Sequence, residues 1–206
     1  LALENTLGGR VLSLDYMQQA TDLARRHGLG THLDGARMFN VKVKLGVSAE
    51  AIAAPFDTVS VCLSKGLGAP VGSVLVGNAD LIARARRQRK MLGGGMRQAG
   101  ILAAAGLYAL ENNVARLAED HANAEMLATG LARFQALRVE PAETNMVWVD
   151  VDPAMAEAFA RHLSAHGVRV TSMHGGRRQR WVTHLDVDAQ AVRTAIGIVE
   201  TFFAWP

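Results

Sequence analysis

The sequence predicts an α/β protein with two domains, and three observations support this prediction. Half of the 206 residues are hydrophobic but only 5% are aromatic, which indicates a core of alanine, leucine and valine of the kind that packs helices on a parallel sheet. Segments with helical spacing alternate with short β-rich apolar runs. The pattern of segments then changes, so we expect one domain over residues 1–113 and a smaller α/β domain over residues 114–206.

The expected elements follow from apolar spacing and from capping residues. In the first domain Ser13 and Asn78 are typical helix N-caps, and Gly28 is a typical helix stop. We expect helices at 14–27, 48–54, 79–91 and 96–110 and strands at 30–34, 58–63 and 72–76, with a glycine hinge at 93–95. We expect further helices at 113–134, 153–166 and 188–203 and strands at 145–151, 168–171 and 180–185.

Composition disfavours several classes of protein. The formal net charge is +3, and the basic runs 84–90 and 177–178 lack interleaved aromatics, so they predict solvated faces or small-anion contacts and no nucleic-acid surface. The lone Cys62 cannot form a disulfide within the chain and is interpreted as a buried apolar residue. Neither a membrane span of about 20 apolar residues nor a signal peptide is evident, so a cytoplasmic location is expected.

The histidines do not predict a metal site. Three or more of them at ligand spacing are absent from the sequence, which disfavours zinc. His32 shares a strand face with Asp34 and is interpreted as structural, as is His184 in a later strand. His174 precedes two glycines and is expected on a loop.

An acidic residue follows the strand predicted at 30–34. Asp34 stands at its carboxyl end, the place where open α/β sheets bind ligands. Gly35 and Ala36 are small enough for a flat molecule to lie near the backbone, and Arg37 adds a fixed positive charge. The alternative is a surface aspartate in a turn beside an unrelated arginine.

A lysine follows the next strand, which is unusual for a glycine-rich turn. Lys65 lies between Ser64 and Gly66, and the order of its glycines does not match a phosphate-binding P-loop. A sequestered lysine is more nucleophilic and can form an imine. Pyridoxal phosphate (PLP) needs such a lysine for its aldehyde and a carboxylate against its pyridine nitrogen, which Lys65 and Asp34 would provide. A simple Asp–Lys ion pair is the alternative.

Four runs of residues, in order, closely resemble the low-specificity L-threonine aldolases: 32–37, 60–72, 89–98 and 182–187. The opening residues 3–6 also fit, so the resemblance extends from residue 3 to about residue 205. It implies the PLP-dependent fold type I (aspartate aminotransferase-like) architecture, with the C-terminal part of the large PLP-binding domain over residues 1–113 and the small C-terminal domain over residues 114–206. The family usually forms homotetramers.

The resemblance also implies roles for single residues. Lys65 matches the lysine that binds PLP as a Schiff base, Asp34 the partner of the pyridine nitrogen, and Arg37 an arginine near the ring hydroxyl and the substrate carboxylate. Either Arg97 or Lys90 is expected to approach the cofactor phosphate, and Arg97 is the one assigned to the cofactor.

The implied activity is that of an aldehyde-lyase. It would cleave L-threonine, L-allo-threonine and related β-hydroxy-α-amino acids to glycine and an aldehyde, and Arg180 matches the arginine that binds the amino-acid carboxylate. The alternatives are a β-eliminating lyase, a serine hydroxymethyltransferase-like enzyme and an inactive oligomerisation module.

The family extends further at the N-terminus, where it supplies a turn that surrounds the cofactor phosphate and histidines near the cofactor ring and the substrate. We therefore expect the chain to carry only part of the site. The expected partners are a small amino-acid substrate and copies of the chain, in a tetramer or dimer.

Overall fold

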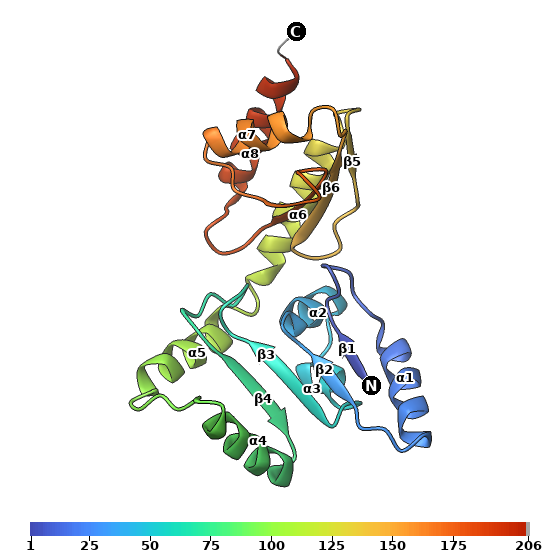
Figure 1. The fold of residues 1–206 in the computed structure, drawn as a ribbon, viewed down its shortest axis with the longest axis vertical. Coiled ribbons are helices and arrows are strands. Elements are labelled where there is room, and N and C mark those ends of the chain that lie inside the picture. The colour runs from blue at the N-terminus through green and yellow to red at the C-terminus, as the bar shows by residue number, and fades with distance from the viewer. Residues whose placement is uncertain (205–206) are drawn as a thin grey trace. The chain divides into compact units, whose positions relative to one another are not determined.

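A computed structural model describes residues 1–204 and shows two compact units (Figure 1). The first comprises Leu1–Leu117 and the second begins at Ala118. The sequence pattern placed the boundary after residue 113. Each unit has its own four-stranded sheet and its own hydrophobic core, as expected of domains built by covering the apolar face of a sheet with helices.

The sheet of the first unit consists of β1 (Ala2–Glu4), β2 (His32–Asp34), β3 (Thr58–Cys62) and β4 (Ser73–Gly77), in that order. The first three strands are parallel, and β4 pairs with β3 in the antiparallel direction. The sheet is therefore parallel, as the composition suggested, except at this edge. The turn-rich connection between β3 and β4 is too short for a parallel crossover, so the chain returns antiparallel.

Five helices accompany this sheet: α1 (Leu14–Arg26), α2 (Met38–Leu45), α3 (Ala49–Ala53), α4 (Ala79–Met91) and α5 (Gly100–Asn112). The predicted caps Ser13 and Asn78 are confirmed, since the side chain of each accepts a hydrogen bond from an amide in the first turn, and Ser48 caps α3 in the same way. Helix α2 was not predicted. Its N-cap position is occupied by Arg37 and no side chain caps it, so the usual start signal is missing.

The core of the first unit joins the helices α1, α2 and α3 to strands β2 and β3. Its fully buried members include Met17, Leu33, Val41 and Ile52. The other end of the sheet, at β4, is exposed by comparison. All five residues of β4 are exposed, and none of the residues of α4 is buried.

The second unit contains β5 (Leu137–Val139), β6 (Met146–Val151), β7 (Thr171–Met173) and β8 (Arg178–Val182), in the order β5-β6-β8-β7. All three strand pairings are antiparallel. Strand β5 was not predicted, and β7 begins where the strand predicted at 168–171 was to end. In this unit some apolar residues lie in short irregular segments, so the alternation of apolar and polar residues that identifies a strand is weak in the sequence.

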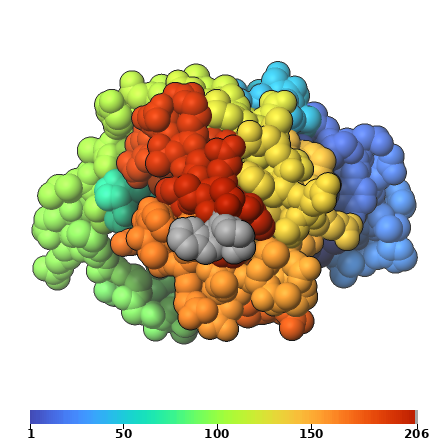
Figure 2. All heavy atoms as spheres, turned by 90° about the horizontal axis from the view of Figure 1, so that it is seen from above, coloured from blue at the N-terminus to red at the C-terminus, as the bar shows by residue number. Residues whose placement is uncertain are grey.

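The helices of the second unit cover one face of its sheet. They are α6 (Leu117–Leu131), α7 (Ala156–Ala165) and α8 (Ala189–Phe203), and α8 packs beside α7 in Figure 2. Phe159 of α7 is fully buried and contacts the rings of Phe202 and Phe203 at centroid distances of 5.1 and 5.8 Å. In residues 1–204 no helix has both the length and the apolar character of a membrane span.

A polar contact fixes the starts of the two central parallel strands. The carboxylate of Asp57 accepts hydrogen bonds from the amide of Thr31 at 2.7 Å and from its hydroxyl at 3.0 Å. These bonds, led by the one from the backbone amide, hold the pKa of Asp57 below its ordinary value of 3.8. The charged carboxylate therefore stabilises the fold.

Replacing Asp57 by Asn is expected to lower the free energy of unfolding by about 1 kcal/mol at pH 7, because bonds to a charged acceptor are weakened. Since the folded-state pKa is lowered, this stabilisation is present above the unfolded-state pKa, taken as the ordinary value of 3.8, and is lost as the pH falls through the folded-state pKa. Urea denaturation between pH 7 and pH 3 measures both effects. Asp22→Asn, which affects only the exposed contacts of Asp22 with Arg25 at 3.4 Å and Gln18 at 2.8 Å, is the control, and equal losses in the two variants would contradict the prediction.

Candidate active site

Asp34 and Lys65 lie at the same edge of the first sheet, where β2 and β3 end. Asp34 is the last residue of β2 and lies opposite Ser60 of the parallel strand β3, whose end at Cys62 leads directly to Ser64 and Lys65. The carboxyl ends of parallel strands meet at one edge, where α/β proteins bind ligands. Both side chains are exposed. The sequence-based expectation for the placement of these two residues at strand ends therefore agrees with the structure.

Close packing of backbones explains the glycine after Asp34. The amide of Gly35 donates a hydrogen bond of 2.8 Å to the carbonyl of Ser60. A Cβ atom at Gly35 would lie 2.8 Å from the same carbonyl oxygen and 3.0 Å from Cγ1 of Val59, closer than atoms normally approach. The Asp34 Oδ1 atom in turn accepts a bond of 3.0 Å from the amide of Ala36, which orients the carboxylate.

The segment that carries Lys65 is anchored on both sides. Leu67 and Ala69 are buried in a small cluster with residues of α5, and the Asn113 side chain donates to the carbonyl of Leu67 at 2.7 Å. The Lys65 carbonyl accepts a bond of 2.9 Å from the amide of Gly68, whose φ of 75° suits glycine. Within residues 1–204 no ion pair or hydrogen bond engages the Lys65 ammonium group, so it is available to a ligand.

The end of β1 contributes a third group at this edge. The amide of Asn5 donates to the carbonyl of Asp34 at 3.1 Å, and its fully buried side chain holds the next loop by bonding the carbonyl and amide of Leu12 at 3.0 and 3.1 Å. Thr6, also buried, keeps its hydroxyl without a hydrogen-bond partner in residues 1–204. Sequence reasoning noted this segment only for its resemblance and assigned no role to Asn5 or Thr6.

The two other basic residues assigned to the cofactor lie at different depths. Arg37 is partly buried and directly precedes α2, three residues after Asp34. Arg97 is exposed on the segment between α4 and α5, and Lys90 is exposed near the end of α4. Among the contacts described for residues 1–204, none links Arg97 or Lys90 to Asp34 or Lys65. Their approach to a phosphate remains a prediction.

Arg180, in the second unit, is the central residue of β8 and is partly buried. Its Nε atom is buried and has no hydrogen-bond partner within residues 1–204. Arg178, two residues earlier on the same strand, is fully engaged: it binds Asp150 at 2.8 and 3.0 Å and Glu140 at 2.6 Å. The hydrogen bond to Glu140 makes the largest contribution to raising the pKa of Arg178 above its ordinary value, and the bonds to Asp150 contribute next.

The histidines have ordinary structural contacts. His32 Nδ1 lies 2.8 Å from the hydroxyl of Thr58 on the neighbouring strand, and the amide of Asp186 donates to Nδ1 of His184 at 3.3 Å. His174 lies on a turn with a φ of 51°. The part of the chain that the structure describes holds no cluster of three or more metal-binding side chains.

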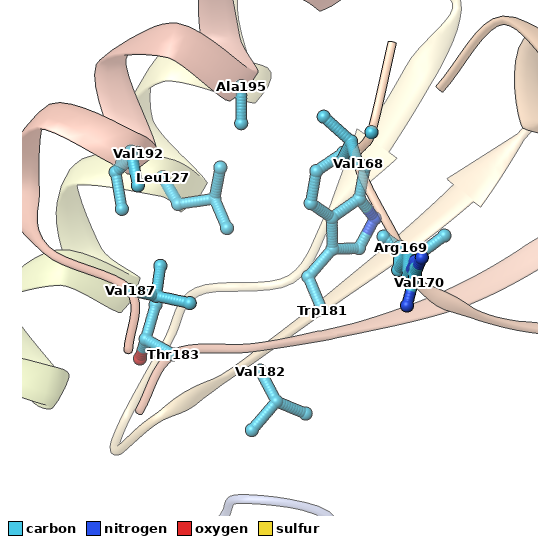
Figure 3. Close-up of a pocket in the computed structure, with 12 residues that line it drawn as sticks. Leu127, Val168, Arg169, Val170, Trp181, Val182, Thr183, Val187, Val192 and Ala195 are labelled. Carbon is cyan, nitrogen blue, oxygen red and sulfur yellow. The ribbon is translucent and has the colours of Figure 1, made fainter. Parts of the chain in front are cut away.

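The second unit also contains a cavity of about 180 Å³. Figure 3 shows its lining, in which Leu127, Trp181, Val187 and Val192 enclose an apolar space between the sheet and the helices α6 and α8. Its polar groups are already bonded: the indole N–H of Trp181 donates to Gln179 at 3.2 Å and the hydroxyl of Thr183 donates to a carbonyl at 2.6 Å. The cavity lacks reactive groups and is a gap in packing, not the candidate site.

Comparison with solved structures defines the class of protein. A threonine aldolase from Leishmania major superposes with a TM-score of 0.79 at 18% identity, covering 98% of this chain and 60% of that one. A serine palmitoyltransferase from Sphingomonas wittichii gives a TM-score of 0.76 at 20% identity, covering 97% of this chain and 53% of that one. The chain has the α/β architecture of fold type I PLP enzymes, as predicted.

Comparison of sequences defines the family. The family model described as beta-eliminating lyase matches residues 1–154, so the chain belongs to this family. A low specificity L-threonine aldolase from Escherichia coli K12 is 47% identical over 204 residues, which is 99% of this chain and 60% of the relative. The resemblance to these aldolases is thus confirmed, and the chain spans about 60% of the length of this curated relative.

Replacing Gly35 by Ala is expected to destabilise the first unit by about 1–3 kcal/mol, because a methyl group would be forced against the backbone of β3. Gly100→Ala is the matched control, since a Cβ there has open space around it and alanine favours the helix. Urea denaturation of both variants checks the prediction. Equal stability of Gly35→Ala and wild type would show that the two backbones can separate at no cost.

Proposed function

We propose that the protein is a PLP-dependent aldehyde-lyase that cleaves L-threonine, L-allo-threonine and related β-hydroxy-α-amino acids to glycine and an aldehyde. The observation that carries this proposal is the placement of Asp34 and Lys65 at adjacent ends of parallel strands. The names of relatives such as the Escherichia coli low specificity L-threonine aldolase support the choice of reaction. We assign the cofactor to Lys65, Asp34, Arg37 and Arg97, and the substrate carboxylate to Arg180 and Arg37.

The residues present fit PLP. The Lys65 amine is exposed and unpaired within residues 1–204, as required of a group that must react with an aldehyde. Asp34 offers an oriented carboxylate, which suits a protonated pyridine nitrogen. Gly35 leaves no side chain on the backbone between them. When bound, PLP supplies an electron sink for the pair of electrons released at the substrate Cα.

Each side chain then has a defined task. Asp34 keeps the proton on the pyridine nitrogen, because a carboxylate within hydrogen-bonding distance favours the charged ring. Lys65 would hold the cofactor through its aldehyde and would supply the amine that the substrate amine replaces. Arg180 and Arg37 are each assigned to the carboxylate of the amino acid because of the family resemblance, and the planar guanidinium of Arg180 suits a pair of parallel hydrogen bonds to a carboxylate. A bound carboxylate would fix the orientation of the amino acid.

The proposals for oligomeric state, location and partners rest on the same family resemblance. We propose a homo-oligomer, a tetramer or a dimer, in the cytoplasm. The substrate is a small amino acid, and no nucleic-acid or membrane partner is proposed.

Lys65→Ala is expected to abolish specific covalent attachment of PLP, because the amine assigned to its aldehyde is removed. Borohydride treatment of the full-length protein with PLP, followed by peptide mass spectrometry, should find the label on the Lys65 peptide in wild type and nowhere specific in the variant. Lys44→Ala, at an exposed lysine of α2, should label as wild type does. Unchanged labelling of Lys65→Ala would exclude the assignment.

The reaction type is tested by its products. Full-length protein given L-threonine and PLP is expected to release acetaldehyde and glycine in equal amounts, because cleavage at Cα–Cβ leaves the amino group on glycine. A β-eliminating enzyme would instead release 2-oxobutanoate and ammonia. Alcohol dehydrogenase coupling measures acetaldehyde, and lactate dehydrogenase coupling measures the oxo acid. Dominance of the oxo acid would replace the aldolase proposal by elimination, and failure to bind PLP would favour an interaction module.

A further inference from the structure

Four side chains share the outer face of the sheet in the second unit. Along β6, Trp148 and Asp150 alternate with buried valines, and along β8, Arg178 and Arg180 alternate with the buried Gln179 and Trp181. The register pairs Asp150 with Arg178 and Trp148 with Arg180. Two arginines and one carboxylate are therefore neighbours on one surface.

Arg178 is paired with two carboxylates, those of Asp150 and Glu140. One of its terminal nitrogens binds both oxygens of Asp150 at 2.8 and 3.0 Å, and the other binds Glu140 at 2.6 Å. Its guanidinium lies 4.8 Å from the ring centroid of Trp148, a distance suited to a cation–π contact. Arg178 is thus fixed by three partners.

Arg180 is in the opposite situation. Asp150 is its diagonal neighbour across β6 and β8, at a separation of about 7–8 Å between backbones that a long side chain can bridge. No ion pair joins Arg180 to a carboxylate of residues 1–204, and its buried Nε has no acceptor. A partly buried guanidinium without a partner is costly, so a structure that keeps one is arranged to receive an anion.

We propose that Arg178 is a positioning residue that holds Asp150 away from Arg180 and so keeps Arg180 available for the carboxylate of the amino-acid substrate. The inference rests on the proposed function of Arg180. Without Arg178, Asp150 is free to swing to Arg180 and to compete with the substrate. Arg138 lies directly opposite Asp150 in the register of β5 and β6, and it is the other cation that a released Asp150 could bind.

The kinetic test uses Arg178→Met in the full-length protein, with Asp150→Asn alone as the control. Arg178→Met should raise KM for L-threonine by about 3- to 10-fold, corresponding to roughly one ion pair, with kcat within about twofold. Arg178→Met combined with Asp150→Asn should return KM to the wild-type value, because the competing charge is gone. A purely structural role predicts no such rescue, so a KM that stays high in the double variant overturns the proposal.

A second readout does not depend on activity. The side-chain Nε–H signal of Arg180, assigned by its loss in Arg180→Lys, reports in ¹⁵N NMR whether the guanidinium is paired. It should shift in Arg178→Met, return in the double variant and stay unchanged in Asp150→Asn. A signal unchanged in Arg178→Met overturns the proposal, because Asp150 has then turned to Arg138 or to solvent.

The two readouts separate the inference from the function on which it rests. If the NMR signal shifts and returns as described but KM never changes, Arg178 does control Arg180 while the assignment of Arg180 to the substrate fails. If Arg178→Met does not fold, Arg178→Lys serves instead, because a single ammonium group cannot bind both carboxylates as a guanidinium does. It should shift the Arg180 signal in the same direction by a smaller amount, and no shift overturns the proposal.

Discussion

The parallel pairing of β2 with β3 is the constraint on which the candidate site depends. Because Asp34 lies opposite Ser60, the end of one strand and the exit of the next are brought to one edge without any direct contact between their side chains. The bond from the Gly35 amide to the Ser60 carbonyl continues this pairing just past the sheet. A shift of register by one residue would turn Asp34 to the other face of the sheet.

The sequence was sufficient to identify candidate site residues where a chemically suitable residue type stands at the end of a recognisable strand. Lys65 follows an apolar run and lies between Ser64 and Gly66, whereas Asp34 ends a short strand and is followed by the small residues Gly35 and Ala36, so both the strand and the reactive group can be recognised from a few residues. Helix α2 was missed because Arg37 occupies its N-cap without capping it. The engagement of Arg178 was invisible as well, because its partners lie 28 and 38 residues away along the chain.

Arg178 and Arg180 show how neighbours decide what a residue type does. They are the same side chain, two positions apart, on the same face of one strand. The first is neutralised by two carboxylates and supported by a tryptophan, whereas the second has none of these partners within the described residues. A resemblance in sequence identifies an arginine, but only the surrounding charges make it available for binding.

The bare strand β4 affects how the protein can be handled. Val74, Leu75 and Val76 are 44, 41 and 51% exposed, and β4 forms an edge of its sheet. An apolar edge with open backbone amides and carbonyls is a template for strand addition by other chains. Residues 1–206 produced on their own are therefore prone to stack edge to edge as concentration rises, and a charged substitution at Val76 would be a direct way to keep them dispersed.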